Sequence, residues 1–344
     1  MNMYKPLITA TALALVSSIS YAEEKTLYLA AYGGSTETLF KKVFIPQWEK
    51  KTGAKVVYVP GKSTDTLAKL RAQESSQEID VAIIDDGPMT QAINFGYCEK
   101  VDDSTFSDLY NAARMPENKA VGVGIVATGF AYNKDYFAKK GWDAPSSWSD
   151  LADPKYKGVL SVPPITNGYG LHALIMAAKI NGGGETNIEP GFEMFESKID
   201  KNVLVYEPSS GKMSELFQSG EIALSIWGSG RLKSLADTGF PGGFSYPKEG
   251  AVNLLITGCP VVDSDVPELA QDFLKFMVSA ETQKALALEK GWGPVNRNTE
   301  LTEEQVGALP VGPERVDKLV TIDYTTVNAA RGNWTKQWTR RIER

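Results

Sequence analysis

The sequence predicts an α/β protein built from two α/β units that one or two crossing strands join. Two runs of alternating strand-like and helix-like segments support this prediction, one before and one after an irregular stretch at residues 102–116. The length of 344 residues favours two domains over one, at roughly 150 residues per domain. No long linker separates the runs, which is why crossing strands are expected at the junction.

The first run opens at residues 27–37 (LYLAAYGGSTE), where a short buried strand is interrupted by Gly33 and Gly34. Ser35 or Thr36 is then a good N-cap for an amphipathic helix that extends to Thr52. Such a junction directs backbone N–H groups to one place, where a carboxylate or phosphate can bind. An ordinary strand-to-helix turn explains these residues equally well.

The first run continues with a strand at residues 55–60, an amphipathic helix at 64–75 and a buried strand at 79–84. This alternation predicts a mostly parallel sheet covered by helices. The last strand ends in Asp85 and Asp86, and Asp86 is a candidate N-cap for a helix that starts near Pro88.

The second run begins with a glycine-rich, strand-like segment at residues 121–133. Further strands are expected at 158–163, 202–207 and 222–227, and helices at 171–179 and 209–219. A long apolar run at 251–262 fits a strand that passes back between the units, and residues 267–287 predict a pair of amphipathic helices. Near the end, Trp334 and Trp338 indicate a closing helix docked by its tryptophans.

Residues 1–22 have the pattern of a secretory signal peptide. Lys5 precedes an apolar stretch at residues 7–16, and Ser20-Tyr21-Ala22 places small residues at positions −3 and −1 of a cleavage site. The apolar stretch is shorter than the ~20 residues that a membrane helix needs. We expect cleavage after Ala22, export to the periplasm and no membrane insertion.

Composition and charge are those of a soluble globular protein, with 42% apolar residues and a net charge of −6. An acidic chain without a basic run argues against nucleic acid or a membrane surface as partner. His172 is the single histidine, and no G-x-S-x-G or H-E-x-x-H motif occurs, so a hydrolase is a distant alternative. Whether Cys98 and Cys259 form a bridge is left open by the sequence.

Several segments together carry a family resemblance: KKTGAKVVYV, IDVAIID, ATGFAYNKDYF, PSSWSDLADPKYKGVLSV, SSGKMSELFQSGEIALSIW, PELAQDFLKFMVSAETQKAL and GPVN. With these segments the chain resembles the periplasmic solute-binding proteins of ABC importers. Within them it is most similar to the polyamine-binding branch, which has relatives for iron, thiamine and amino-carboxylates. The resemblance covers nearly all of the chain after residue 22, and WSDLADPKYKG and LFQSGEIA are its most specific parts.

The resemblance implies a type II-like periplasmic-binding-protein fold, with crossover strands as the hinge between two lobes that close on a ligand. It implies a monomer that captures a small solute, delivers it to an inner-membrane ABC permease, and needs neither catalysis nor a cofactor. By analogy, lobe 1 comprises residues 23–124 plus 257–309 and lobe 2 comprises residues 125–256. Residues 310–344 would pack on lobe 2.

Loops at the carboxyl ends of strands are expected to line the cleft. The candidate ligand-binding residues are Tyr32, Gly34, Ser35, Thr36, Asp85, Asp86, Thr166, Asn167, Tyr169, Ser210, Trp227, Arg231, Asn253 and Trp292. Trp227 and Trp292 offer aromatic walls, although a core position fits each of them as well.

The charges indicate the class of ligand. Polyamine-binding relatives place carboxylates in the second lobe, whereas the loops at residues 165–171 and 251–259 contain no acid. Arg231 could hold a carboxylate, or it could be a solvated helix residue. If Asp85 meets an ammonium group, a small zwitterion such as an ω-amino acid fits best, and a polyamine is the alternative. The chain lacks the adjacent tyrosine pair of iron-binding relatives, so no metal is expected.

Overall fold

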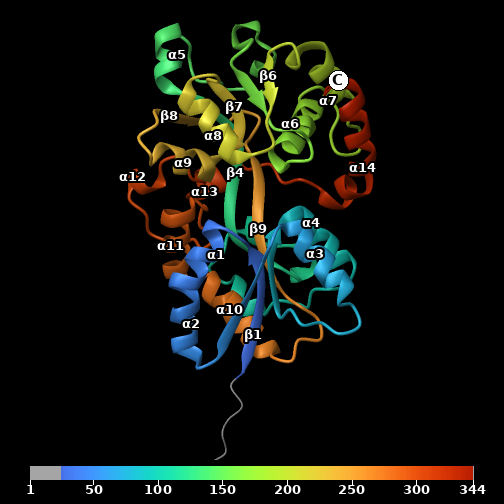
Figure 1. Cartoon of the computed structure of the whole chain (residues 1–344), viewed down its shortest axis with the longest axis vertical. Helices are drawn as coiled ribbons and strands as arrows, with labels where there is room; N and C mark the ends of the chain where they lie inside the picture. Colours follow the sequence, from blue (N-terminus) through green and yellow to red (C-terminus); the bar gives the residue numbers. More distant parts are fainter. Residues whose placement is uncertain (1–24, 344) are drawn as a thin grey trace, which may run out of the picture.

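The computed structural model describes residues 25–343 and shows two α/β lobes connected by long strands (Figure 1). The predicted signal peptide lies outside the described residues. The strands are β1 (Thr26–Tyr32), β2 (Lys55–Gly61), β3 (Val81–Asp85), β4 (Val121–Asn133), β5 (Leu160–Val162), β6 (Val203–Tyr206), β7 (Leu224–Gly228), β8 (Gly242–Ser245) and β9 (Val252–Pro260).

The helices follow the strands in near alternation. They are α1 (Ser35–Leu39), α2 (Ile45–Thr52), α3 (Ser63–Ala72), α4 (Asp86–Asn94), α5 (Lys134–Lys140), α6 (Gly168–Lys179), α7 (Glu189–Met194), α8 (Ser210–Ser219), α9 (Ser229–Ala236), α10 (Pro267–Met277), α11 (Ala280–Lys290), α12 (Glu303–Val306), α13 (Pro313–Val316) and α14 (Tyr324–Arg341). Two π-helical turns lie at Phe40–Phe44 and Phe195–Ile199. Short 3₁₀ turns lie at Asp103–Phe106, Asn111–Ala113, Pro116–Asn118, Trp148–Ala152 and Pro154–Tyr156.

The strands form one mixed sheet in the order β2-β1-β3-β9-β4-β7-β5-β6, with β8 paired to β4. The first three strands are parallel to one another, and so are β7, β5 and β6. Between these two parallel groups, β9 and β4 run antiparallel to each other and to their outer neighbours. The first half of β4 therefore belongs to one lobe and its second half to the other, so that β4 and β9 form the connection (Figure 1).

Two large hydrophobic cores lie on either side of this connection. In β4 the apolar side chains belong to the first core up to Val126 and to the second from Phe130. In β9 the change falls between Val252 and Leu255. A smaller cluster under α8 and α9 adds to the second lobe. The two-lobed fold is thus present, while the domain boundaries at residues 124/125 and 256/257 stay predictions.

Cys98 and Cys259 form a disulfide, with their Cα atoms 5.7 Å apart. The bond attaches the segment after α4 to the end of β9, and both residues belong to the first core. The question that the sequence left open is thereby answered. Among residues 25–343, no helix is both long and apolar enough to span a bilayer.

The helix after β1 begins one residue earlier than its sequence pattern predicts. Gly34 is its N-cap residue, with φ of 69°, and no side chain caps the helix. The prediction that Ser35 or Thr36 is the N-cap is therefore wrong, because the left-handed conformation that glycine adopts readily makes the turn one residue earlier. This shift leaves the Ser35 hydroxyl available to another partner.

Candidate functional site

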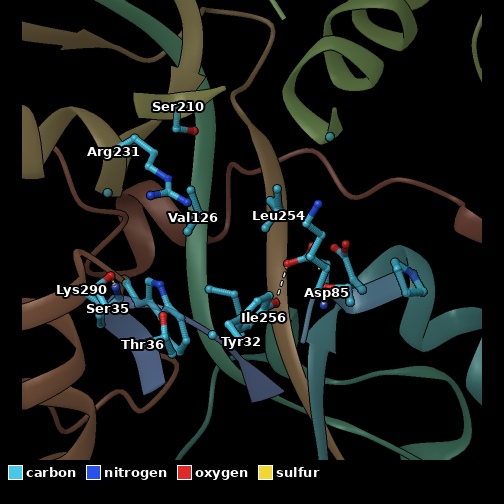
Figure 2. A pocket seen from close by; sticks show the side chains of 18 of the residues that line it. Tyr32, Ser35, Thr36, Asp85, Val126, Ser210, Arg231, Leu254, Ile256 and Lys290 are labelled. Carbon is cyan, nitrogen blue, oxygen red and sulfur yellow. Dashed lines mark hydrogen bonds between the residues drawn. The ribbon is translucent and has the colours of Figure 1, made fainter. Parts of the chain in front are cut away.

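A cavity of about 1450 Å³ lies between the lobes. Its apolar floor comes from the connecting strands, with Val126 on β4 and Leu254 and Ile256 on β9 (Figure 2). The floor therefore belongs to the two strands that join the lobes. Polar and charged side chains line the walls on both sides of the floor.

Asp85 provides a negative charge on the first lobe. It stands at the end of β3, where Tyr32 donates to its Oδ1 at 2.6 Å and Ser63 to its Oδ2 at 3.0 Å. Burial raises the pKa of this carboxyl, and the hydrogen bonds from Tyr32 and Ser63 oppose the rise. Each carboxylate oxygen can accept more than one hydrogen bond, so Asp85 retains capacity for an ammonium group in the cleft.

Arg231 and Lys290 provide positive charge on the other side of the floor, as Figure 2 shows. Arg231 lies in the first turn of α9 and is exposed to the cleft, where it hydrogen-bonds with Tyr169. Lys290 ends α11, and its Nζ donates to Ser35 Oγ at 2.7 Å. Burial and the nearby Arg231 both lower the pKa of Lys290. These two cations repel each other, and an anion between them would relieve that repulsion.

An aromatic pair forms part of the wall near the floor. The rings of Tyr32 and Trp292 meet edge to face, with centroids 6.2 Å apart. Gly124 on β4 makes room for this arrangement, since a Cβ there would lie 2.9 Å from the Trp292 side chain. Trp292 is 7% exposed and lines the cavity, so it gives the cleft an apolar, water-excluding surface.

Helix α14 contributes to the cavity wall beside the first lobe's acids. Tyr324 and Arg331 both line the cavity, although they come from the last part of the chain. Arg331 Nη2 donates to the Thr166 carbonyl at 3.2 Å, and Asn328 Nδ2 donates to the Gly87 carbonyl at 2.9 Å. The helix thus contacts both lobes.

A chain of buried hydrogen bonds crosses between the lobes through Tyr324. Thr128 Oγ1 and His172 Nδ1 are 2.8 Å apart, and His172 Nε2 is 2.8 Å from the Tyr324 hydroxyl. Tyr324 in turn hydrogen-bonds with Asp86. The remaining contacts of Asp86 are to backbone N–H groups, from Gly87 to Oδ1 and from Leu255 to Oδ2, both at 2.9 Å.

Burial shifts the pKa values of Asp86 and His172, and the two shifts have opposite effects on how stability changes with pH. Burial raises the pKa of Asp86 to about 7, against the lowering effect of the Leu255 amide. Burial, helped by the charge of Arg331, lowers the pKa of His172 to about 3. Folded Asp86 keeps a proton that the unfolded chain releases near pH 4, so its contribution to stability is lost as the pH rises towards 7. His172 has the reverse effect, since only the unfolded chain protonates it below about pH 6.5.

Replacing Asp86 with asparagine should isolate the first of these effects. The free energy of unfolding of Asp86→Asn, minus that of the unchanged protein, is expected to rise by about 1.4 kcal/mol per pH unit between about pH 4.5 and 6.5. Urea unfolding at several pH values measures this slope. Any change in packing or hydrogen bonding that the introduced amide causes adds an offset independent of pH. A difference that stays constant with pH would contradict a raised pKa at Asp86.

Most of the residues predicted to bind ligand line this cavity. They are Tyr32, Ser35, Thr36, Asp85, Asp86, Thr166, Asn167, Tyr169, Ser210, Arg231 and Trp292. Two of them have structural roles as well. The helix α4 begins at Asp86, which therefore is not its N-cap; its carboxylate instead accepts a hydrogen bond from the Leu255 amide on β9. Asn167 caps α6, because its side chain accepts from the Tyr169 amide at 2.9 Å.

Three predicted residues do not line the cavity. Trp227 is 1% exposed and stacks on Phe217 in the core under α8, because its position on β7 directs it to that face of the sheet. Asn253 is buried on β9, where its backbone amide donates to the Val320 carbonyl at 2.9 Å. Gly34 forms the turn into α1, and its neighbour Gly33 lines the cavity in its place.

Among the cavity-lining residues that were not candidates from the sequence are Lys290, Tyr324 and Arg331. The last two were detectable in part, since Tyr324, Asn328 and Arg331 stand at i, i+4 and i+7 and so share one helix face. Lys290 stands two residues before Trp292, which was a candidate from the sequence.

The cavity presents side chains of both charges to a small molecule. The single histidine is buried against Thr128 and Tyr324. Within residues 25–343, no group of three or more His, Cys, Asp or Glu side chains is placed to hold a metal ion.

Comparisons with known proteins agree with this description. The model of the family "Bacterial extracellular solute-binding protein" matches residues 44–310. A gamma-aminobutyric acid-binding protein of Pseudomonas aeruginosa is 21% identical over 327 residues, covering 89% of this chain and 88% of the relative. A spermidine/putrescine-binding periplasmic protein of Escherichia coli is 25% identical over 303 residues, covering 84% of this chain and 83% of the relative.

The fold is also similar to that of solved proteins. The crystal structure of an ABC transporter protein from Clostridium perfringens superposes with a TM-score of 0.80 at 24% identity, covering 92% of this chain and 99% of that one. The family match spans most of the chain, and the cleft between two lobes is present. The chain therefore belongs to the bacterial extracellular solute-binding protein family.

Proposed function

We propose that the cleft binds a small zwitterionic amino compound, with its ammonium group near Asp85 and its carboxylate near Arg231 and Lys290. One observation carries the proposal: side chains of opposite charge face each other across an apolar floor (Figure 2). The floor of Val126, Leu254 and Ile256 suits the methylene groups that separate the two charges in such a ligand.

A polyamine is the weaker alternative. A diamine needs an acid at each end, but all of the acids that line the cavity, Asp65, Asp85, Asp86 and Glu289, come from the first lobe's segments. The second lobe presents Arg231 instead, which would repel an ammonium group. The similarity to a gamma-aminobutyric acid-binding protein supports a zwitterion, although the similarity to spermidine/putrescine-binding proteins is of equal extent.

The size of the cavity supports closure of the lobes on binding. Its volume of about 1450 Å³ exceeds the roughly 300–1,000 Å³ of a typical ligand pocket. An approach of the walls would reduce this volume and bring Asp85 and Arg231 closer to a small zwitterion between them. Binding would then draw the lobes together by bending β4 and β9, and the closed form would be the one that the permease recognises.

The proposal extends to the setting in which the protein acts. The chain is exported to the periplasm, is cleaved after Ala22 and works as a monomer that passes its solute to an inner-membrane permease. An amino terminus at Glu23 and a monomer mass in solution would support this, and an uncleaved or dimeric protein would contradict it.

Thermal-shift and calorimetric titrations with 4-aminobutyrate, glutamate, putrescine and glutarate test the ligand class. The zwitterions should stabilise the protein most, because a ligand that binds the folded state raises its stability. Asp85→Asn should weaken the zwitterions about tenfold or more and leave glutarate unaffected, since glutarate has no ammonium group. Preferential binding of putrescine, or no response to any of these compounds, would overturn the proposal.

A further inference from the structure

The wall beside Asp85 carries both signs of charge. Arg331 extends from α14 to the same cavity as Asp85, and its positive charge is among those that lower the pKa of that carboxyl, after the effect of Arg231. The guanidinium of Arg331 donates to two backbone carbonyls, Thr166 at 3.2 Å and Ile165 at 3.5 Å. A guanidinium has five N–H donors, so most of its hydrogen-bonding capacity remains for a ligand.

The side chains that line the cleft carry more positive than negative charge. Asp86 is occupied by Tyr324 and by the amides of Gly87 and Leu255, whereas Asp85 keeps capacity for a ligand. The two other acids that line the cavity, Asp65 and Glu289, are matched in number by Lys42 and Lys62, which line it as well. Arg231, Lys290 and Arg331 take part in no ion pair within residues 25–343. A zwitterion with one ammonium and one carboxylate would leave this excess of positive charge uncompensated.

We infer that the preferred ligand is an α-amino acid that carries a second anionic group. Its ammonium group contacts Asp85 and its α-carboxylate contacts Arg331. The second anionic group contacts Arg231 and Lys290. This inference rests on the proposed function and narrows it. The second anion is a carboxylate or a phosphonate, since both accept hydrogen bonds from paired cations. A short methylene chain over Leu254 and Ile256 joins the two ends.

The proposed contact between Arg331 and the ligand's α-carboxylate explains why the cleft would discriminate against an ω-amino acid. In such a ligand the ammonium group stands alone at the Asp85 end, and the adjacent guanidinium repels it. In an α-amino acid the carboxylate beside the ammonium pairs with that same guanidinium. Arg331 is therefore the residue that determines specificity at this end of the cleft.

Calorimetry on the full-length mature protein tests the inference. The compounds are glutamate, 2-aminoadipate and 2-amino-4-phosphonobutyrate, with 4-aminobutyrate and glutarate for comparison. At least one of the first three should bind about tenfold or more tightly than either comparison compound, and the best of the three identifies the second anion. If 4-aminobutyrate binds as tightly as the best of them, the inference fails and the proposed function stands. If none of the five binds, both fail.

Variants on α14 test the role of Arg331 itself. Arg331→Met should weaken the best α-amino acid about tenfold or more and leave 4-aminobutyrate unchanged or tighter. Arg331→Lys, which keeps the charge, should restore part of the preference, and Arg340→Met on an exposed position of the same helix should change neither ligand. An equal loss of both ligands in Arg331→Met would show a structural role and overturn the inference.

Discussion

Replacing Arg231 and Lys290 together with methionine should weaken the binding of a carboxylate-bearing zwitterion by 100-fold or more. A hydrogen bond to a charged group contributes about 1.5–3 kcal/mol, and the ligand carboxylate would lose two cationic partners. Burial, followed by the charge of Arg231, lowers the pKa of Lys290, and the two cations repel each other. Arg231→Met alone should cost about 1.5–3 kcal/mol of binding free energy.

Calorimetry of the two single variants and the double variant measures these losses and their coupling. The single effects are not expected to add, because removal of one cation relieves the repulsion felt by the other. Lys233→Met is the matched control on α9, since Lys233 pairs with Asp237 at 2.7 Å and does not line the cavity. Unchanged affinity in the double variant would remove both residues from the binding site.

Replacing Cys98 and Cys259 with alanine should lower the free energy of unfolding by roughly 5 kcal/mol, as chain-entropy arguments give for so long a loop. The two cysteines are 161 residues apart, and the chain between them includes strands β4 to β8. Without the disulfide, the unfolded chain gains the conformational entropy that the covalent loop removes. Denaturant unfolding of the oxidised protein and of the double variant measures the difference.

Ligand binding provides the control for the disulfide variant. Neither cysteine lines the cavity, so calorimetry under conditions in which both proteins are folded should give the same affinity. A loss of stability below about 1 kcal/mol would contradict the expected role of the bridge, and a loss of affinity would show that the bridge also shapes the cleft.

The regular elements were largely predictable because they depend on local patterns. The strand at residues 121–133 was expected with the bounds that β4 has, and the alternation in residues 26–94 gave the order of the first lobe. Apolar periodicity and glycine positions determine such elements within a few neighbouring residues. The cap of α1 was mispredicted because glycine and serine both suit a helix start, and the backbone conformation of Gly34 decided between them.

The site was predictable only in part because tertiary packing decides which side chains face the cleft. Tyr32 and Asp85 were found because they end β1 and β3, and Arg231 because it stands three residues after the end of β7. Trp227 also stands near a strand end, but the alternation of side chains along β7 directs it into the core, where it stacks on Phe217. Arg331 could not be placed from sequence, because nothing local shows that α14 passes beside α4.

Small-angle X-ray scattering tests the central claim, that a ligand bound between the lobes closes them. The protein is measured alone and saturated with whichever compound in the titrations stabilises it most. The radius of gyration is expected to decrease on saturation of the unchanged protein. The same compound is expected to leave it unaltered in the Arg231→Met/Lys290→Met variant. An unchanged radius of gyration in the saturated, unchanged protein would contradict closure.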